Sequence, residues 1–285
     1  SPQPLRGLEG WGEGRQITKG VIAAFASPSR EGGHLLVELL DGRSKGFDIW
    51  IVDDKGRKIK PVAATSEDEG NPHWSPDGSR VVYQSFSKIK GYRVWVGDLR
   101  DFSPPVLIGE GITPAWLPDG RSIVFSRKDP GGWNIYRAEI PSAGKAPVPQ
   151  KRLTSDGGTN QYPFGGQIHG KEKIIFVKIP LPRGNRSSAI WMMDPNGENP
   201  EVLTDFGLKQ PHRFAGPVMA AFGVDLFFWE IESEGRHSIW SMNLEKREPS
   251  RVIANAANPQ ISSDGKFLFV NSKASGWSQI WSFSR

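Results

Sequence analysis

A turn followed by a strand-forming run recurs along the chain, and this repeat limits the possible folds more than any other feature. The clearest copies of the turn motif are Asn71–Gly78, Thr113–Gly120 and Asn258–Gly265. A pair of one aliphatic and one aromatic residue marks the repeats more regularly, at Ile49-Trp50, Val94-Trp95, Ile135-Tyr136, Ile190-Trp191, Ile239-Trp240 and Ile280-Trp281. Self-similarity with a period of roughly 40–55 residues indicates a repeat architecture.

Each repeat predicts four short β-strands. The first strand carries a Pro-x-Trp segment, the second follows an Asp-Gly turn, and the third contains the aliphatic–aromatic pair. The fourth resembles Arg152-Leu153-Thr154. Pro, Gly and Asp separate these runs, and helical periodicity is missing throughout. Four strands per repeat are typical of a β-propeller blade.

The Pro-Asp-Gly turns have a physical explanation. Proline fixes φ near −65°, the aspartate side chain accepts hydrogen bonds from the following amides, and glycine adopts a positive φ. We therefore expect Asp77, Asp119 and Asp264 to form turns. A large flat indole suits the space between neighbouring blades, so we expect Trp74, Trp116 and Trp191 to pack in the core.

The pattern at the two ends of the chain predicts how the ring closes. The last repeat stops at its third strand, Ile280-Trp281-Ser282-Phe283, whereas Arg15-Gln16-Ile17-Thr18 resembles a fourth strand without a repeat of its own. Pairing these segments would remove an exposed sheet edge. We therefore expect an all-β, six-bladed propeller with four antiparallel strands per blade over residues 15–285, closed by residues 15–18 and preceded by a tail over residues 1–14. Seven blades are the competing count, but no seventh aliphatic–aromatic pair is found.

Composition excludes several classes of protein. The absence of cysteine excludes disulfides, thiolate zinc sites and a cysteine nucleophile, and no segment reaches the ~18 apolar residues of a membrane span. A net charge of +5 favours acidic partners. Nucleic-acid binding would need a clustered basic stripe, and we do not expect it. The start, Ser1-Pro2-Gln3-Pro4-Leu5, has no initiator methionine and no apolar signal segment, so we expect a processed or trimmed terminus.

The Pro-x-Trp-Ser-Pro-Asp-Gly motif, the Ile-Trp strand and the Leu-Thr strand resemble the WD40-like (PD40) repeat of TolB-type propellers. The resemblance covers residues 15–285, and the α/β domain that precedes the propeller in that family has no counterpart in residues 1–14. Proteins of this type are usually extracytoplasmic binding scaffolds. The resemblance therefore implies a periplasmic or otherwise extracytoplasmic protein whose signal peptide has been removed. Fold-level likeness leaves the function itself open.

Motifs for catalysis are missing from the sequence. It contains no Gly-x-Ser-x-Gly elbow, no His-Glu-x-x-His, no phosphate-binding glycine loop and no EF-hand loop. The missing motifs therefore favour a non-catalytic protein, although a metal-dependent enzyme remains an alternative.

One candidate site lies at the mouth of the central channel. His73 and His212 each follow a proline, which suggests equivalent positions on the innermost strands of opposed blades. Imidazole, amide and carboxylate groups there could bind a divalent cation or a small polar ligand. The alternative is that these side chains pack between blades or face channel water. The candidate residues are His73, His212, Gln260, Gln161, Glu67 and Asp68.

A second candidate site is a basic rim on the loops between the second and third strands. Such loops converge on one face of a propeller, and aromatic residues lie among the basic ones. The alternative is that these are simply solvated loops. The candidate residues are Arg43, Lys45, Lys88, Lys90, Tyr92, Arg127, Lys128, Trp133, Arg183, Arg186, Arg236, Lys273 and Trp277.

Three functions fit these features. The first is a non-catalytic, extracytoplasmic recognition scaffold that binds a protein or peptide partner on the face carrying the basic rim. The second is a metal-dependent propeller that binds or cleaves an acidic glycan. It is similar to oligogalacturonate lyases, whose seventh blade is missing here. The third is a structural subunit of a larger complex, docked through Gly10-Trp11-Gly12.

Overall fold

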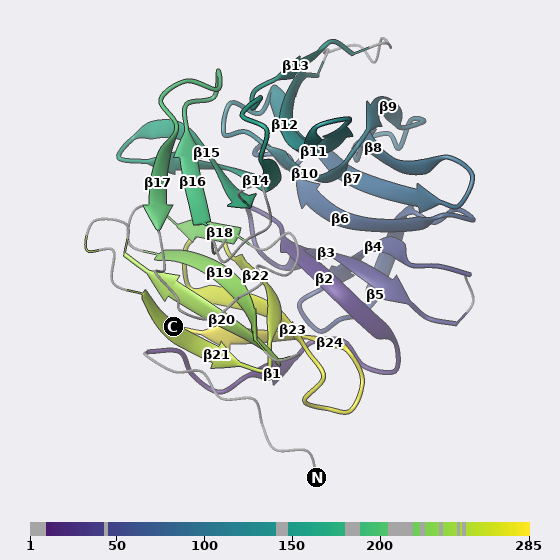
Figure 1. Ribbon diagram of the computed structural model, residues 1–285. Helices are drawn as coiled ribbons and strands as arrows, with labels where there is room; N and C mark the ends of the chain where they lie inside the picture. Colours follow the sequence, from purple (N-terminus) through teal and green to yellow (C-terminus); the bar gives the residue numbers. More distant parts are fainter. Residues whose placement is uncertain are drawn as a thin grey trace.

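The computed structural model describes residues 10–42, 45–140, 148–179, 189–204, 219–222, 226–233, 236–243, 246 and 249–285. Within these ranges every regular element is a β-strand, so the expected all-β class is confirmed. Four-stranded antiparallel sheets are set around a common centre (Figure 1), as in a β-propeller. The first and last sheets of the ring lie side by side although they come from opposite ends of the chain.

Five sheets are each built from four consecutive strands. Sheet I contains β2 (Ile22–Pro28), β3 (His34–Leu40), β4 (Asp48–Asp53) and β5 (Lys58–Ala63), and sheet II contains β6 (Asp68–Trp74), β7 (Arg80–Ser87), β8 (Gly91–Asp98) and β9 (Val106–Glu110). Sheet III contains β10 (Ile112–Trp116), β11 (Ser122–Asp129), β12 (Gly132–Glu139) and β13 (Gln150–Arg152), and sheet IV contains β14 (Thr159–Ile168), β15 (Lys171–Ile179), β16 (Ala189–Met193) and β17 (Glu201–Thr204). Sheet V contains β18 (Met219–Phe222), β19 (Leu226–Ser233), β20 (Arg236–Met242) and β21 (Pro249–Ala254).

The closure of the expected six-bladed ring needs correction. Sheet VI is composite, because β22 (Ala257–Ile261), β23 (Phe267–Ser272) and β24 (Gln279–Ser284) take their fourth strand from β1 (Arg15–Gln16). The expected closing strand over residues 15–18 is wrong in its extent, since only Arg15 and Gln16 pair, with Ser282 and Trp281. Only five sheets are therefore self-contained, and the ring closes through a two-residue strand.

A threonine hydroxyl explains why β1 stops after Gln16. The backbone N–H of Ile17 donates to the carbonyl of Ile280 at 2.8 Å, but the N–H of Ile280 donates to Thr18 Oγ1 at 3.0 Å instead of to a backbone carbonyl. The Thr18 hydroxyl in turn donates to Gln279 Oε1 at 2.6 Å, so this buried group is satisfied. The side chain thus replaces the next step of the strand ladder.

Sheet III repeats this arrangement at its own Leu-Thr segment. Leu153 donates its N–H to the carbonyl of Ile135 at 2.8 Å, and Ile135 donates its N–H to Thr154 Oγ1 at 2.9 Å. The Thr154 hydroxyl donates to Asn134 Oδ1 at 3.1 Å. In the Leu-Thr motif the threonine hydroxyl therefore takes the place of a backbone carbonyl as acceptor between the third and fourth strands.

The Asp-Gly turns form as the sequence predicts. In sheet II the Asp77 carboxylate accepts hydrogen bonds from the hydroxyls of Ser75, at 2.5 Å, and Ser79, at 2.7 Å. Gly78 closes the turn with φ of 73° and donates its N–H to the carbonyl of Ser75 at 2.8 Å. Asp119 and Asp264 likewise accept from backbone N–H groups that follow them, so the turn role expected for all three aspartates is confirmed.

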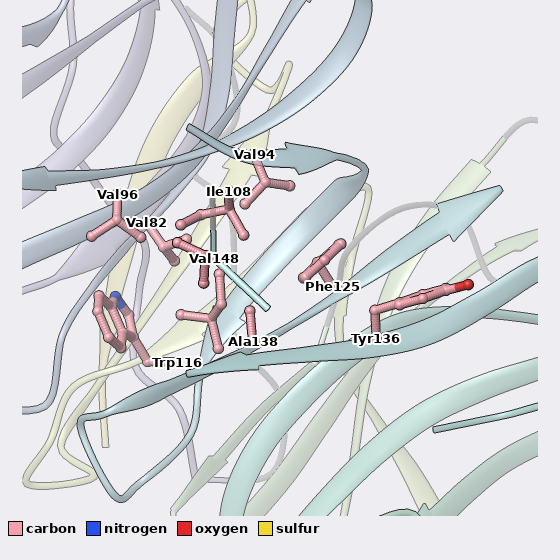
Figure 2. Packing of buried hydrophobic residues seen from close by; sticks show 10 residues of the cluster. Val82, Val94, Val96, Ile108, Trp116, Phe125, Tyr136, Ala138 and Val148 are labelled. Carbon is pink, nitrogen blue, oxygen red and sulfur yellow. The ribbon is translucent and has the colours of Figure 1, made fainter. Parts of the chain in front are cut away.

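Tryptophans fill the seams between sheets, as expected. Trp74 Nε1 donates to the carbonyl of Ser27 in sheet I at 3.0 Å, and Trp116 Nε1 donates to the carbonyl of His73 in sheet II at 3.2 Å. Figure 2 shows Trp116 beside Val82 and Val96 of sheet II. Each indole therefore belongs to one sheet and packs on the sheet before it. Trp191 is half-buried and packs on the cluster between sheets III and IV.

The segment before β1 differs from the expected tail. Trp11 is only 6% exposed and belongs to a core cluster with Val252, Leu268 and Phe283. The N–H of Gly12 donates to the carbonyl of Ser284 at 2.9 Å, so this segment continues along β24. Trp11 is therefore part of the packed core and cannot act as the free docking handle that the structural-subunit hypothesis requires.

Replacing Trp116 with alanine should destabilise the protein by roughly 3–5 kcal/mol, because the change empties a filled seam and removes the hydrogen bond to the carbonyl of His73. Urea unfolding would measure this change. Trp277→Ala is the matched control, since Trp277 is 68% exposed and its loss should leave stability nearly unchanged. Equal effects of the two substitutions would contradict the role of Trp116 in the seam.

Replacing Thr18 with valine should lower stability by about 1–3 kcal/mol, because it leaves the N–H of Ile280 and Oε1 of Gln279 without a buried partner. Thermal unfolding would detect the loss. Thr18→Ser, which keeps the hydroxyl, should retain most of the stability. A stable valine variant would show that the hydroxyl does not support closure.

Candidate functional site

The described residues of the basic rim predicted from the sequence lie on one face of the molecule, which we call the rim face. In each antiparallel sheet the connection between the second and third strands turns back at the same end as the connection to the next sheet. Residues from distant parts of the sequence therefore converge on that face. The hairpins β7–β8, β11–β12 and β23–β24 all contribute to it.

Four lysines of the rim face are exposed and form no ion pair with any of the residues that the structure describes. They are Lys45, Lys88, Lys128 and Lys273. Lys90 lies close to them but is 3.9 Å from Oε1 of Glu67. The four ammonium groups are therefore available to an acidic partner in water.

Arg127 of the predicted rim and the nearby Lys178, which was not among the predicted rim residues, have structural contacts instead. Arg127 donates to Gln150 Oε1 at 3.0 Å, lies 3.8 Å from Asp129, and sits 4.6 Å above the ring of Tyr136. Lys178 lies 4.4 Å from the ring of Trp191 and pairs with Asp156. These cations cover the aromatic residue of the third strand and are held in place by it.

Apolar side chains accompany the free lysines. Ile89, at the tip of the β7–β8 hairpin, is 95% exposed, and Trp277 in the β23–β24 connection is 68% exposed. Tyr92 is exposed and packs on Phe86 with ring centroids 4.6 Å apart, whereas Trp133 is half-buried. The sequence analysis missed Ile89 as a member of this surface. Its position between Lys88 and Lys90 in the hairpin could have indicated that it is exposed.

A small pocket adjoins Trp277 on the rim face. It has a volume of about 280 Å³ and lies at the seam between sheets VI and I. Its walls are formed by Gly20, Val21, Ile22, Leu40, Trp277 and Gln279. An apolar pocket beside an exposed tryptophan suits the anchor residue of a bound peptide.

Four predicted site residues cannot be placed. Arg43, Arg183, Arg186 and His212 lie outside the described residues. The backbone of Arg236 belongs to β20, but its side chain is also outside the description.

The predicted channel-mouth site is not assembled as expected. His73 pairs with Val82 of β7, and the corresponding residue in sheet V, by its register with β19, is Ala220. The place that matches His73 in sheet V is therefore held by Ala220, and the expected equivalence of His73 and His212 falls on a residue outside the described ranges. Gln260 does occupy the position that matches His73, whereas Gln161 pairs with Val177 and does not.

The side chains at this mouth have packing and pairing roles. The His73 ring meets the ring of Phe25 edge-on with centroids 5.2 Å apart, and burial lowers the pKa of His73 to about 4, so it is neutral at physiological pH. Burial acts to raise the pKa of Glu67, but hydrogen bonds from Ser85 and Arg93 and the nearby positive charge outweigh it and lower the pKa.

Glu67 and Asp68, the two acidic residues predicted at the mouth, both accept hydrogen bonds from other groups of the protein. Glu67 accepts from Arg93 Nη2 at 2.6 Å, and Asp68 Oδ1 accepts the N–H of Phe47 at 3.0 Å. Among the described residues, no group of three or more histidines and carboxylates is arranged to hold a metal ion.

A ring of side-chain acceptors, one on each of sheets I to III, was missed by the sequence analysis. The residue before the strand proline adopts a left-handed conformation, with φ of 51° at Asn71 and 52° at Thr113. The resulting bulge turns its N–H toward the preceding sheet, where Glu38 Oε2 accepts at 3.2 Å and Gln84 Oε1 at 2.7 Å. Tyr162, with φ of 58°, donates in the same way to a serine hydroxyl of β11.

Glu38 is the charged member of this ring. Burial raises its pKa to about 7, against the opposing hydrogen bond from Asn71, and the charge of Asp68 raises it further. A Cβ at position 70 would lie 2.8 Å from Glu38 Oε2, so Gly70 leaves room for this carboxyl group in its present position. Glu38 and Gln84 thus accept equivalent backbone hydrogen bonds, but Glu38 does so with a carboxyl group and Gln84 with a neutral amide.

Glu38→Gln should make the protein more stable at alkaline pH. In the parent protein the unfolded chain loses the Glu38 proton near pH 4.5, whereas the folded state keeps it until about pH 7, so stability falls across this interval. The glutamine variant should lack that fall and gain about 1–3 kcal/mol above pH 7, with little change below pH 4.5. Urea unfolding at a series of pH values would measure both limits.

The control for this experiment is Glu67→Gln. Its carboxylate is stabilised by Arg93 and has a lowered pKa, so its loss should reduce stability at neutral pH. A Glu38→Gln variant that is equally stable to the parent at pH 8, or less stable, would contradict the assignment of Glu38.

Comparison with known proteins supports the fold. No protein-family model matches the chain. A stretch of 94 residues is 27% identical to the Tol-Pal system protein TolB of Desulfotalea psychrophila, which covers 32% of this chain and 21% of that protein. The chain therefore matches only about a fifth of the length of this curated relative.

Solved structures of low sequence identity have the same architecture. TolB from Acinetobacter baumannii is 19% identical with a TM-score of 0.63, covering 93% of this chain and 64% of that chain. A putative TolB from Agrobacterium tumefaciens is 15% identical with a TM-score of 0.66, covering 95% and 96%. Oligogalacturonate lyase from Vibrio parahaemolyticus is 9% identical with a TM-score of 0.60, covering 99% and 96%. The resemblance to TolB-type propellers is thus confirmed at the level of the fold.

Proposed function

We propose that this chain is a non-catalytic, extracytoplasmic recognition scaffold that binds an acidic protein or peptide on its rim face. The observation that carries the proposal is the set of four exposed, unpaired lysines, contributed by three sheets and the composite sheet VI. Because turn formation does not require a lysine at any of these places, the convergence of charge favours a binding role. The similarity to TolB proteins supports a protein partner and an extracytoplasmic location.

The apolar groups on the same face support a peptide or protein over a simple anion. Charged residues steer a partner toward a surface, whereas buried apolar anchors supply most of the affinity. Ile89, Trp277 and the pocket beside Trp277 provide such anchor sites between the lysines. No helix among the described residues is long and apolar enough to cross a membrane.

The glycan hypothesis is not favoured by the geometry. It depended on a pair of opposed histidines at the channel mouth, but the residue of sheet V that matches His73 by register is Ala220. The likeness to oligogalacturonate lyase is one of fold at 9% identity. It carries no argument for a shared substrate.

Charge reversal tests the proposal. Changing Lys45, Lys88, Lys128 and Lys273 together to glutamate should slow association with the partner roughly tenfold or more, because the steering field changes sign. Thermal stability should stay the same, since exposed charges contribute little to folding. The partner is first captured from an envelope extract on the immobilised chain, and its association rate with each variant is then measured by surface plasmon resonance.

The matched control reverses four exposed cations on the opposite face, at Lys55, Arg121, Lys171 and Lys246. This variant has the same net charge but keeps the rim face intact, so it should bind nearly as the parent does. Raising the salt concentration well above 0.15 M should slow the parent, because the Debye length is then under about 8 Å. Equal slowing by both variants would attribute the effect to net charge and refute the rim face as the binding surface.

A further inference from the structure

The seam between sheets VI and I lacks the tryptophan that fills the seams of sheets II and III. Trp74 pairs with Val81 and Trp116 pairs with Ile123, each at the end of the first strand. By the same register, the matching residue of sheet I is Pro28, which pairs with Leu35. A pyrrolidine ring is much smaller than an indole. The space that an indole occupies at the first strands of sheets II and III therefore holds only a proline ring at this seam.

The residue that faces this position from the preceding sheet also differs between the seams. In sheet II, Arg80 lies 4.8 Å from the ring of Trp116 and donates to the carbonyl of Gly120 at 2.8 Å. Phe267 holds the matching place in sheet VI, since its N–H donates to a turn serine at 2.9 Å as the N–H of Arg80 does. Phe267 is 42% exposed, so its ring faces solvent where Arg80 covers a tryptophan.

A cavity of about 360 Å³ occupies this seam. Pro28, Leu35, Phe267 and Phe269 give it an apolar part, and the insertion Ser29–Gly33 forms a wall. The rest of the lining is polar and includes Arg15, His34, Asp54 and Asp264. The hydroxyl of Ser263 donates to the carbonyl of Arg30 at 2.5 Å, which ties this wall to the turn of sheet VI. The cavity belongs to the turns between first and second strands, on the face opposite to the rim face.

We infer that this cavity binds the planar aromatic ring of a small molecule about the size of indole. Its volume lies within the ~300–1,000 Å³ of small-molecule sites, and its apolar lining residues offer aromatic and aliphatic contacts to a bound ring. The bound ring would lie against Phe267 and exclude water from it. The hydrogen bond from Ser263 fixes the wall on the side of sheet I, so this side of the site is already formed before a ligand binds.

Indole itself is the probe, measured by isothermal titration calorimetry on the full chain. The parent protein should bind indole saturably, and indole should raise its melting temperature. Pro28→Trp should lower indole affinity at least tenfold, because the new side chain takes the place of the ligand, and it should raise the melting temperature of the free protein. Phe267→Ala should also weaken binding at least tenfold while leaving the fold intact, since its ring is partly exposed.

Ile59→Ala is the matched control, because Ile59 is an exposed apolar residue of β5 outside the cavity, and it should bind indole as the parent does. Absence of saturable indole binding by the parent, or unchanged binding by both Pro28→Trp and Phe267→Ala, would overturn the inference. Binding of N-acetyltryptophanamide without binding of indole would also overturn it, because the ring would then have to come from a peptide. The rim-face lysine variant should bind indole normally, so this test is independent of the proposed function.

Discussion

The packing of the ring depends on the short segment that joins its first and last strands. Ile17 enters the core between sheets VI and I beside Leu35 and Ile280, while Trp11 enters the core on the other side of sheet VI. One stretch of chain therefore supports both seams of the composite sheet. The two-residue strand β1 gives few backbone hydrogen bonds, and side-chain burial together with the Thr18 hydroxyl supplies the rest of the closure.

Charge on this molecule divides into two kinds with different effects. Arg93, Arg127 and Lys178 lie over aromatic rings of their own sheets and pair with nearby carboxylates, so they fix side chains of the scaffold. Lys45, Lys88, Lys128 and Lys273 have no such partners among the described residues. Distinguishing these two kinds requires the structure, because both stand in similar runs of the sequence. The smaller set of unpaired lysines gives the rim face its positive charge.

The sequence predicted the strand content, the Asp-Gly turns and the seam tryptophans because each depends on local chemistry at a fixed place in the repeat. It failed where distant residues decide the outcome. His212 follows a proline as His73 does, yet register with β19 assigns the matching place to Ala220. The segment around Trp11 resembles a flexible tail by its glycines, and only the cluster it joins, around Leu268, determines its burial. The raised pKa of Glu38 depends on enclosure by a neighbouring sheet, which no local pattern records.

The turns that define the repeat also bear on how the protein ages. An aspartate followed by glycine is prone to form a succinimide, when the glycine nitrogen attacks the side-chain carboxyl carbon, and the protonated carboxyl reacts more readily than the carboxylate. In sheet II the nitrogen of Gly78 is engaged with the carbonyl of Ser75. Hydrogen bonds from Ser75 and Ser79 lower the pKa of Asp77 to about 2, so its carboxyl group stays ionised. The same hydrogen bonds that shape the turn therefore protect its most reactive peptide link from isomerisation over the lifetime of the protein.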